Sequence, residues 1–152
     1  MLVILEGCDG TGKSTTAKRI ASVLNADIIH CSTKTPNDYE FFHNIIKMSH
    51  WKNIVADRFF YGQFVYQKPE ERHLTRDELT KLESEVLGAN GKIIIVEASE
   101  QDIASRLGAR GEELINGLTI KEVLEGFRKM AKDSFLPVEV WNTSTGIDTR
   151  NN

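Results

Sequence analysis

The sequence predicts a three-layer α/β domain, in which a doubly wound parallel sheet of five strands is covered by helices on both faces. Three observations lead to this prediction. Short apolar runs alternate with longer amphipathic segments, which is typical of parallel strands joined by crossover helices. Glycines and helix-capping residues separate these segments, as they do at element boundaries. The chain has 152 residues, of which 40% are hydrophobic, so we expect one compact domain over residues 1–152.

The first elements flank a glycine-rich loop. The run LVILE at residues 2–6 is apolar up to its final acid, as in a strand buried on both faces. The amphipathic segment after the loop predicts a helix to Leu24. A short second strand, DIIHC, covers residues 27–31. Pro36 follows a threonine, which matches an N-cap and the first helical position, so we expect a helix from Pro36 to Trp51.

The middle of the chain repeats this alternation. The run NIVAD at residues 53–57 is the expected third strand and ends in an acid. Thr75 and Glu78 have the spacing of a capping box, which predicts a helix that continues to Leu87. The run KIIIVE at residues 92–97 is rich in β-branched residues and predicts the fourth strand.

The last part of the chain completes the pattern. Ser99 is placed to cap a helix that ends at Leu107. The polar, glycine-containing run GARGEELING at residues 108–117 then predicts a loop. A second capping box opens a helix over residues 119–132. The run PVEVW at residues 137–141 is the expected fifth strand.

Charge and composition limit the partners and the compartment. The net charge is −3 and the isoelectric point is near 5.8, which argues against the broad basic face that nucleic acids require. We therefore expect no stable nucleic-acid partner. The apolar start of the chain is too short for a signal peptide or a membrane span, so we expect no membrane association. Cys8 and Cys31 are too few for a disulfide framework or zinc site, and indicate reduced thiols in a cytoplasmic protein.

The loop after the first strand has the strongest functional pattern. Residues 7–14, GCDGTGKS, satisfy G-x-x-x-x-G-K-[ST]. Glycines let several backbone N–H groups point at one spot, and the next helix aims its positive end there, which makes an anion cradle. Lys13 can reach the β- and γ-phosphates of a nucleotide, and the Ser14 hydroxyl can ligate the Mg²⁺ that bridges them. The predicted ATP-binding residues are Gly7, Asp9, Gly10, Thr11, Gly12, Lys13, Ser14 and Thr15.

The third strand ends in the pair Asp57-Arg58. An acid after an apolar run is typical of a magnesium-facing position, so we expect Ser14 and Asp57 to share the metal. The planar guanidinium of Arg58 suits a phosphate. The alternative is that Asp57 and Arg58 form only a salt-bridged strand end. Asp9 raises a separate question, because a carboxylate near phosphates is repelled unless a neutral sugar, a cation or Arg58 lies next to it.

These motifs together resemble the thymidylate kinase branch of the P-loop nucleoside and nucleotide kinases. The run ILEGCDGTGKSTTAKRIA at residues 4–21 is similar to that family's first strand, phosphate loop and first helix. The run DRFFYGQFVYQ at residues 57–67 resembles its D-R-[YF] motif with a following Tyr-Gln pair. The run RLGARGEE, followed by FRKMA at residues 127–131, resembles its arginine-bearing lid and the next helix. The resemblance implies a P-loop NTPase fold of the nucleotide kinase type, with a lid at about residues 106–117.

The resemblance also implies an acceptor site. Asp9 matches a loop acid that hydrogen-bonds the 3′-hydroxyl of the acceptor sugar, and Arg58 matches an arginine that clamps the acceptor phosphate. Tyr66 matches an aromatic residue that packs on the deoxyribose and excludes a 2′-hydroxyl. Gln63 falls where the family places a polar side chain that reads the base, and its amide could pair with a pyrimidine edge.

On the donor side, the resemblance implies that Arg106 and Arg110 close over the nucleotide and neutralise charge on the transferring group. The implied reaction transfers the γ-phosphoryl group of MgATP to a deoxynucleoside monophosphate, with dTMP or another pyrimidine as acceptor. A phosphomonoester has its second pKa near 6 and is already largely ionised at neutral pH, so no general base is required. The catalytic residues are expected to be Lys13, Asp57, Arg58, Arg106 and Arg110.

The sequence departs from the family's pattern in several places. Phe59 replaces the usual tyrosine and Gly62 replaces the usual serine after the D-R motif. The stretch between the second and third strands is short, and the family's closing helix is missing after residues 142–145, which we expect to border the donor base. A homodimer through residues 41–48 is possible, although the same apolar stripe could simply pack on the sheet.

Two alternative functions remain open at this point. The acceptor could be a hydroxyl group, on a deoxynucleoside or on a modified base in DNA, and Asp57 would then act as general base. The chain could also be a regulatory module that binds ATP without transferring phosphate. The shortened acceptor region favours this second alternative, whereas the combination of Arg58, Tyr66 and the lid arginines favours a kinase.

Overall fold

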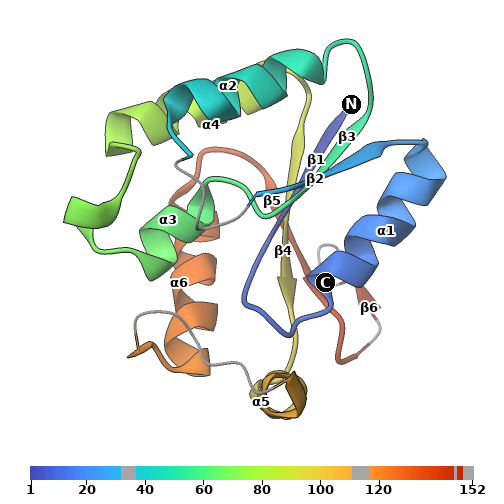
Figure 1. Cartoon of the computed structure of the whole chain (residues 1–152), viewed down its shortest axis with the longest axis vertical. Helices are drawn as coiled ribbons and strands as arrows, with labels where there is room; N and C mark the ends of the chain where they lie inside the picture. The colour runs from blue at the N-terminus through green and yellow to red at the C-terminus, as the bar shows by residue number, and fades with distance from the viewer. Residues whose placement is uncertain (32–36, 111–116, 146, 149–152) are drawn as a thin grey trace.

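The computed structural model describes residues 1–31, 37–110, 117–145 and 147–148. One sheet runs through the centre of the molecule (Figure 1), with the strand order β2-β3-β1-β4-β5-β6. The first five strands in this order are parallel, and β6 is antiparallel to β5. The prediction of five parallel strands is confirmed, whereas the short β6 was not expected. The strands are β1 (Leu2–Glu6), β2 (Asp27–His30), β3 (Ile54–Asp57), β4 (Lys92–Glu97), β5 (Val138–Asn142) and β6 (Ile147–Asp148).

Helices cover both faces of the sheet. In Figure 1, α1 lies on one side, and α2, α3, α4 and α6 lie on the other. The helices are α1 (Lys13–Leu24), α2 (Tyr39–Met48), α3 (Tyr61–Tyr66), α4 (Arg76–Gly88), α5 (Glu100–Arg110) and α6 (Ile120–Asp133), with a short 3₁₀ helix η1 (Pro69–Glu71) between α3 and α4. Within these described ranges, no helix combines the length and apolarity needed to span a membrane.

The alternation of side chains along β1 produces the two cores. Val3 and Leu5 pack with Ala17 and Ala21 of α1 in the smaller core. The alternate β1 residues face the other side, where the larger core contains side chains from α2, α3, α4, α5 and α6. Because successive residues of a strand point to opposite faces, a strand in the middle of a three-layer domain must be apolar throughout. This requirement explains the unbroken apolar runs in the sequence.

Three helix boundaries differ from the prediction, and one of them is the end of α2, which was expected at Trp51 and lies at Met48. The helix expected to begin at Pro36 begins instead at Tyr39, because Asp38 has extended backbone and its carboxylate accepts the Phe41 N–H at 3.0 Å. Asp38 is therefore the N-cap, and Pro36 itself lies outside the described residues. The helix expected to end at Leu107 continues to Arg110, so the first three residues of the expected 108–117 loop are helical.

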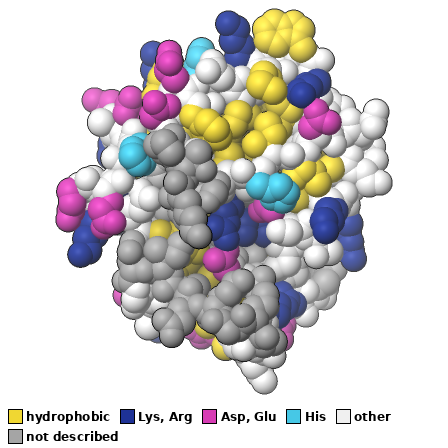
Figure 2. Space-filling view, in the orientation of Figure 1, with side chains coloured by type: hydrophobic (Ala, Val, Ile, Leu, Met, Phe, Trp, Pro, Cys, Tyr) yellow, Lys and Arg dark blue, Asp and Glu magenta, His cyan; other side chains and the backbone are white. Residues whose placement is uncertain are grey.

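The apolar stripe of α2 packs inside the monomer. Phe42, Ile45 and Ile46 are buried in the larger core. This agrees with the expected alternative in which the apolar stripe of residues 41–48 packs on the sheet. A homodimer through this helix stays a prediction. On the face shown in Figure 2, lysine and arginine side chains are interspersed with acidic ones over the described surface.

Both predicted capping boxes are present, at Thr75/Glu78 and at Thr119/Glu122. We expect Thr75→Ala to lower the free energy of unfolding by about 1 kcal/mol, because the Glu78 N–H loses its acceptor at the start of α4. Urea denaturation measures this change. Thr80→Ala is the matched control, since Thr80 is exposed on α4 and its hydroxyl donates to the Arg76 carbonyl of the same helix. An equal loss in both variants would contradict the capping role.

Candidate functional site

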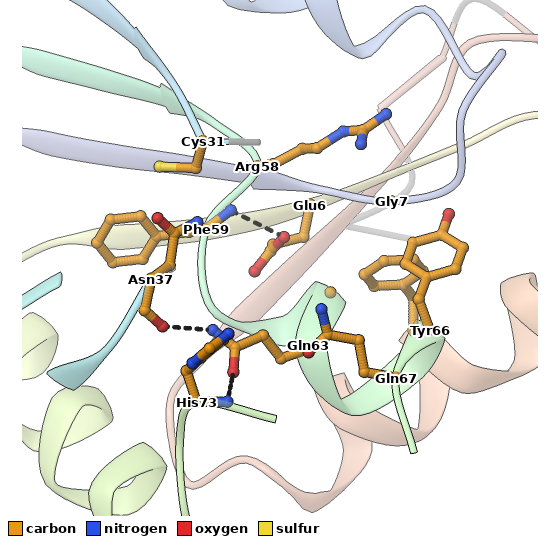
Figure 3. Close-up of a pocket in the computed structure, with 12 residues that line it drawn as sticks. Glu6, Gly7, Cys31, Asn37, Arg58, Phe59, Gln63, Tyr66, Gln67 and His73 are labelled. Carbon is orange, nitrogen blue, oxygen red and sulfur yellow. Dashed lines mark hydrogen bonds between the residues drawn. The ribbon is translucent and has the colours of Figure 1, made fainter. Parts of the chain in front are cut away.

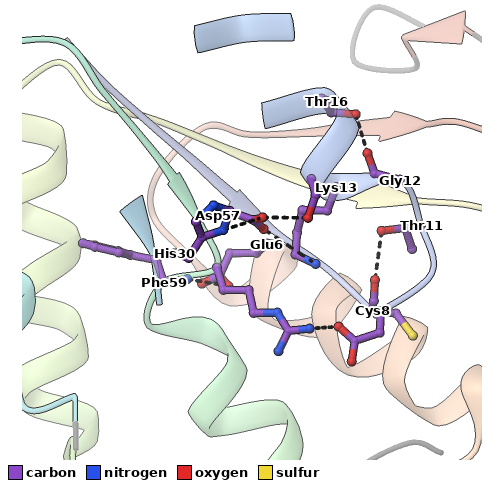
Figure 4. Close-up of polar contacts among 12 residues, drawn as sticks. Glu6, Cys8, Thr11, Gly12, Lys13, Thr16, His30, Asp57 and Phe59 are labelled. Atoms are coloured by element: carbon purple, nitrogen blue, oxygen red, sulfur yellow. Dashed lines mark hydrogen bonds and ion pairs between the residues drawn. The ribbon is translucent and has the colours of Figure 1, made fainter. Parts of the chain in front are cut away.

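The candidate site lies where three neighbouring parallel strands end. β3 pairs with both β1 and β2, so Leu5, His30 and Asp57 stand side by side in register. The loop of residues 7–12 leaves β1 at this rim, and the Asp57-Arg58 pair leaves β3 beside it. The sequence analysis expected these two motifs to lie close together, with Ser14 and Asp57 sharing a metal ion, and the pairing of β1 with β3 places them side by side. The pocket side of the rim is drawn in Figure 3 and the loop side in Figure 4.

The loop has a backbone that only glycine adopts easily. Gly7 has φ 143°, and a Cβ there would lie 2.4 Å from the Val96 carbonyl oxygen of β4. Gly12 has φ 88° and is the N-cap residue of α1, which begins at Lys13. The positive end of α1 is therefore directed at the loop, as an anion cradle requires. Ser14 and Thr15 occupy the exposed first turn of this helix.

Side chains from distant segments hold the loop from outside. The Arg106 guanidinium on α5 donates to the Gly10 carbonyl at 2.8 Å. The Thr143 hydroxyl, in the turn after β5, donates to the Thr11 carbonyl at 2.5 Å. Inside the loop, the Thr11 hydroxyl donates to the Cys8 carbonyl at 2.9 Å. Three loop carbonyls thus have donors, and the turn at residues 142–145 lies against the loop. That this turn borders the donor base stays a prediction.

An acid and a base are buried together beside the loop (Figure 4). Lys13 is only 6% exposed, and its Nζ lies 4.0 Å from Asp57 Oδ1. The Ser14 hydroxyl donates to Asp57 Oδ2 at 2.8 Å. Burial of a charged ammonium is costly unless an opposite charge lies nearby, which Asp57 supplies. The sequence predicted this set of three residues for phosphate and metal binding, and the structure brings them together.

The oxygens of Ser14 and Asp57 fit a magnesium site. Mg²⁺ prefers hard oxygen ligands and keeps several waters, so one or two protein oxygens together with phosphate oxygens complete its shell. A hydroxyl and a carboxylate oxygen 2.8 Å apart can both reach one ion at this rim.

His30 joins this centre without having been predicted. Its Nδ1 lies 3.2 Å from Asp57 Oδ2, while the ring is largely exposed. The sequence analysis gave His30 no role because its spacing to other histidines is not that of a metal site. The signal that could have identified it is its position at the carboxyl end of β2, which becomes informative only when β2 is known to pair with β3.

Asp9 and Arg58 form an ion pair across the rim. Both side chains are partly buried. The position of this pair resolves the question of an acid inside an anion-binding loop, because a guanidinium balances the carboxylate. Arg58 is also one of three described non-glycine residues with positive φ, at 70°. The other two are Asn25 and Asn90, and asparagine adopts this conformation more easily than arginine does.

Glu6, the last residue of β1, is a second residue at this rim to which the sequence analysis gave no role. Its side chain is 1% exposed. Its two carboxylate oxygens accept the Phe59 N–H at 3.1 Å and the Tyr61 N–H at 2.6 Å. Burial raises the pKa of Glu6 to about 7, against the opposing effects of these two N–H groups and of the Lys13 and Arg58 charges. The signal in the sequence is an acid that directly ends an apolar strand.

A pocket that is partly open to solvent lies beside the loop (Figure 3). Three predicted acceptor residues line it: Arg58, Gln63 and Tyr66. The other lining residues are Glu6, Gly7, Cys31, Asn37, Phe59, Gly62, Gln67, His73 and Phe127. The departures Phe59 and Gly62 therefore both lie at this pocket.

The Gln63 amide is engaged with backbone groups. Its Nε2 donates to the Asn37 carbonyl at 2.6 Å, and its Oε1 accepts the His73 N–H at 3.0 Å. Gln63 thus joins the chain before α2 to the chain before α4 at the wall of the pocket. The Arg72 Nε donates to the Gln63 and Gln67 carbonyls, both at 3.2 Å, and so satisfies the end of α3. A base-reading role for Gln63 would use the remaining hydrogen and lone pair of its amide.

Tyr66 closes the pocket on the loop side. Its ring packs edge-on against Phe127 of α6, with ring centroids 5.9 Å apart. Its hydroxyl lies near the Cys8 thiol, and burial raises the pKa of both groups. A neutral tyrosine fixed between α3 and α6 presents a rigid ring to the pocket, which suits packing against a sugar or a base.

The expected lid is described in part. Arg106 lies on α5 and already contacts the loop. Arg110 ends α5, and its side chain lies outside the described part of the chain, as do residues 111–116. The predicted residues of the loop and the Asp57-Arg58 pair lie at the rim where β1, β2 and β3 end. Gln63 and Tyr66 line the adjoining pocket from α3.

Comparison with known proteins gives a consistent set of relatives. No protein-family model matches the chain. The SPbeta prophage-derived uncharacterized protein YorR of Bacillus subtilis is 32% identical over 148 residues, covering 93% of this chain and 88% of YorR. The crystal structure of YorR in complex with phosphorylated GDP has a TM-score of 0.76 at 26% identity, over 99% of this chain and 90% of YorR.

Two thymidylate kinases are also similar. The enzyme of Campylobacter hominis is 28% identical over 145 residues, which covers 73% of this chain and 73% of that protein. The crystal structure of the enzyme from Ehrlichia chaffeensis has a TM-score of 0.56 at 18% identity, over 99% of this chain and 92% of that one. At this identity the second comparison supports the fold alone.

We expect Gly7→Ala to lower the free energy of unfolding by more than about 1 kcal/mol, because the new Cβ requires both a positive φ and a close contact with β4. Urea denaturation measures this loss. Gly88→Ala, at the end of α4 where a Cβ would meet nothing within 4 Å, is the control and should be neutral or stabilising. A neutral Gly7→Ala would show that the loop backbone can rearrange.

The buried Glu6 should make stability depend on pH. Its pKa is raised in the folded state, so the uncharged form is favoured and the corresponding stability is present below about pH 4.5 and lost as pH rises through about 7. Between pH 5 and pH 8 we expect the unfolding free energy of the wild type, relative to Glu6→Gln, to fall by about 2 to 3 kcal/mol. Denaturant titrations at several pH values test this, and a constant difference would refute the raised pKa.

Proposed function

The chain belongs to the thymidylate kinase-like P-loop kinases, and from this membership we propose that it transfers the γ-phosphoryl group of MgATP to a deoxynucleoside monophosphate, with dTMP or another pyrimidine nucleotide as acceptor. The observation that carries the proposal is the adjacency of two anion sites. Lys13, Ser14 and Asp57 form one beside the loop. Arg58 lies at the edge of the neighbouring pocket and is within contact distance of the loop through Asp9.

This adjacency suits an in-line transfer between two phosphates. Lys13 would hold the β- and γ-phosphates of the donor, and Arg58 would hold the acceptor phosphate, so that the reacting oxygens meet between them. Ser14 and Asp57 would hold Mg²⁺, which supplies charge neutralisation on the donor phosphates when bound. Alignment and charge neutralisation are then the main contributions of the protein, because the acceptor oxygen is already ionised near neutral pH.

The acceptor side of the proposal rests on the pocket. When the acceptor binds, Arg58 would break its ion pair with Asp9 and would hold the acceptor phosphate instead. The Asp9 carboxylate would then be available to accept a hydrogen bond from the 3′-hydroxyl of the sugar. Tyr66 would pack on the deoxyribose, and Gln63 would approach the base edge from the pocket wall. Because YorR was crystallised with phosphorylated GDP, guanine nucleotides belong in any panel of donors and acceptors tested with this chain.

We also propose that residues 106–117 act as a lid over the donor. Arg106 is already fixed on the loop at the Gly10 carbonyl, and Arg110 would join it on the phosphates. The buried free thiols of Cys8 and Cys31 fit the reducing cytoplasm, where we propose that the reaction takes place.

A hydroxyl acceptor is the second candidate, and Glu6 is the observation that favours it. Burial raises the pKa of Glu6 to about 7, a value that suits a general base, and Glu6 lines the pocket. Asp57, the other nearby acid, is held by Ser14 and His30. Phosphate transfer to thymidine but not to dTMP would favour this candidate. Tight MgATP binding with no transfer to any acceptor would favour a regulatory module instead.

We expect Lys13→Ala and Arg58→Ala each to lower turnover by about a hundredfold or more, since each removes a charge that neutralises a phosphate. The assay offers labelled ATP or GTP with thymidine, the four deoxynucleoside monophosphates and DNA. Lys18→Ala removes a lysine from the exposed face of the same helix, α1, and should leave turnover unchanged. Near-normal turnover in either of the first two variants would overturn that residue's role.

A further inference from the structure

We propose that Glu6 is a positioning residue for Arg58: its two carboxylate oxygens bind the backbone turn that directs Arg58 into the acceptor site. The identity of the ligand at Arg58 rests on the proposed function, whereas the link between Glu6 and the turn does not. Neither the resemblance of the sequence nor the comparisons assign a role to Glu6.

The turn after β3 has an unfavourable backbone conformation at Arg58. Its φ of 70° is uncommon for a long side chain, and such conformations persist where surrounding contacts determine them. Three hydrogen bonds from this turn end on the last two residues of β1. The Arg58 N–H donates to the Leu5 carbonyl at 2.9 Å, and the N–H groups of Phe59 and Tyr61 donate to Glu6.

The direction of the Arg58 side chain follows from this arrangement. The left-handed backbone turns the guanidinium toward the loop, where it meets Asp9. With extended backbone at Arg58, the side chain would leave β3 in a different direction. Glu6 supplies two of the three bonds to the turn, and both are to a charged acceptor, which makes them stronger than bonds to a neutral one. Figure 3 shows the hydrogen bond from the Phe59 N–H to the Glu6 carboxylate as a dashed line.

The charges around Glu6 allow it to remain an acceptor while buried. Lys13 on α1 and Arg58 on the turn both favour its ionised form. Three neutral titratable side chains also lie near Glu6: Cys31, which follows β2, and Tyr61 and Tyr66 of α3. Asp57, at the end of β3, adds a further negative charge near Cys31. Burial outweighs the two cations and raises the pKa of Glu6 to about 7. Below this pH the two N–H bonds lose their charged acceptor, so the hold on Arg58 should weaken.

A double-mutant cycle tests whether Glu6 acts through Arg58. Glu6→Gln keeps the size of the side chain but replaces one acceptor oxygen with an NH₂ group that faces a backbone N–H. We expect it to raise the KM for the acceptor about tenfold, in line with the loss of one hydrogen bond to a charged group, and to change kcat by less than about twofold. In the Arg58→Ala background, Glu6→Gln should have little further effect on kcat/KM.

Glu83→Gln is the matched control for loss of a buried carboxylate. Glu83 is also buried and accepts the Tyr61 hydroxyl at 2.7 Å, but it does not line the pocket. It should lower stability without raising the acceptor KM. If the effects of Glu6→Gln and Arg58→Ala on kcat/KM were fully additive, the proposal would be overturned. A Glu6→Gln variant with a lower kcat and an unchanged acceptor KM would also overturn it, because that result indicates a general base.

A second measurement needs no substrate. In ¹⁵N-labelled wild-type protein, the backbone amide signals of Phe59 and Tyr61 should shift with pH along one titration with a midpoint near 7, and these shifts should be absent in Glu6→Gln. Equal titration curves in both proteins would overturn the link to the turn. If the amides titrate as expected while no nucleotide is phosphorylated, the proposed function fails and the positioning role stands.

The protonation of Glu6 should also appear in the kinetics. The acceptor KM of the wild type should rise as the pH falls from 8 to 6. The acceptor phosphate titrates in the same pH range. The acceptor KM of the wild type at each pH is therefore divided by that of Glu6→Gln, in which only the titration of the substrate remains. A ratio that does not change with pH would contradict the proposal.

Discussion

The parallel pairing of β1 with β3 is the constraint on which the site depends. Their register places Leu5 beside Asp57, so the phosphate loop that follows β1 and the Asp57-Arg58 pair that follows β3 leave the sheet as neighbours. In an open parallel sheet, ligands bind at the carboxyl ends of strands, where helix N-termini and loops converge. Here the same pairing also lets Glu6, the last residue of β1, reach the turn after β3. The residues that we propose to bind the donor, the metal and the acceptor therefore depend on one pair of strands.

The charges at this rim are arranged so that each buried ion has an opposite partner. Lys13 lies beside Asp57, Asp9 beside Arg58, and Glu6 is influenced by both cations. An unpaired ion in these positions would be costly, because little water reaches them. Under the proposed function, a phosphate that approached Arg58 or Lys13 would replace one anionic partner with another. A site of this kind can bind highly charged ligands without holding uncompensated charge when it is empty.

Much of this arrangement could be predicted from the sequence, and the remainder depends on tertiary placement. Residues 7–14 and both capping boxes have local patterns that fix their structure, so they were identified correctly. The roles of His30, Glu6 and Thr143 could not be read locally, because each depends on which strand or loop lies next to it. The helix α2 begins at Tyr39 and not at Pro36, because the Asp38 carboxylate accepts the Phe41 N–H. Asp38 and the threonine before Pro36 are both plausible N-caps, and propensity alone does not decide between them.

The hydrogen bond from Thr143 to the Thr11 carbonyl joins positions 132 residues apart. Thr143 also donates its N–H to the Glu97 carbonyl at 2.9 Å, so it connects two strand ends with the nucleotide-binding loop. In a saturation-mutagenesis experiment, substitutions at Thr143 should therefore be tolerated as poorly as substitutions in the glycine-rich loop, and less well than substitutions at the sequence neighbours of Thr143. In an alignment of this family, the positions of Thr143 and Thr11 should covary, because a change in one of these residues alters the space available to the other.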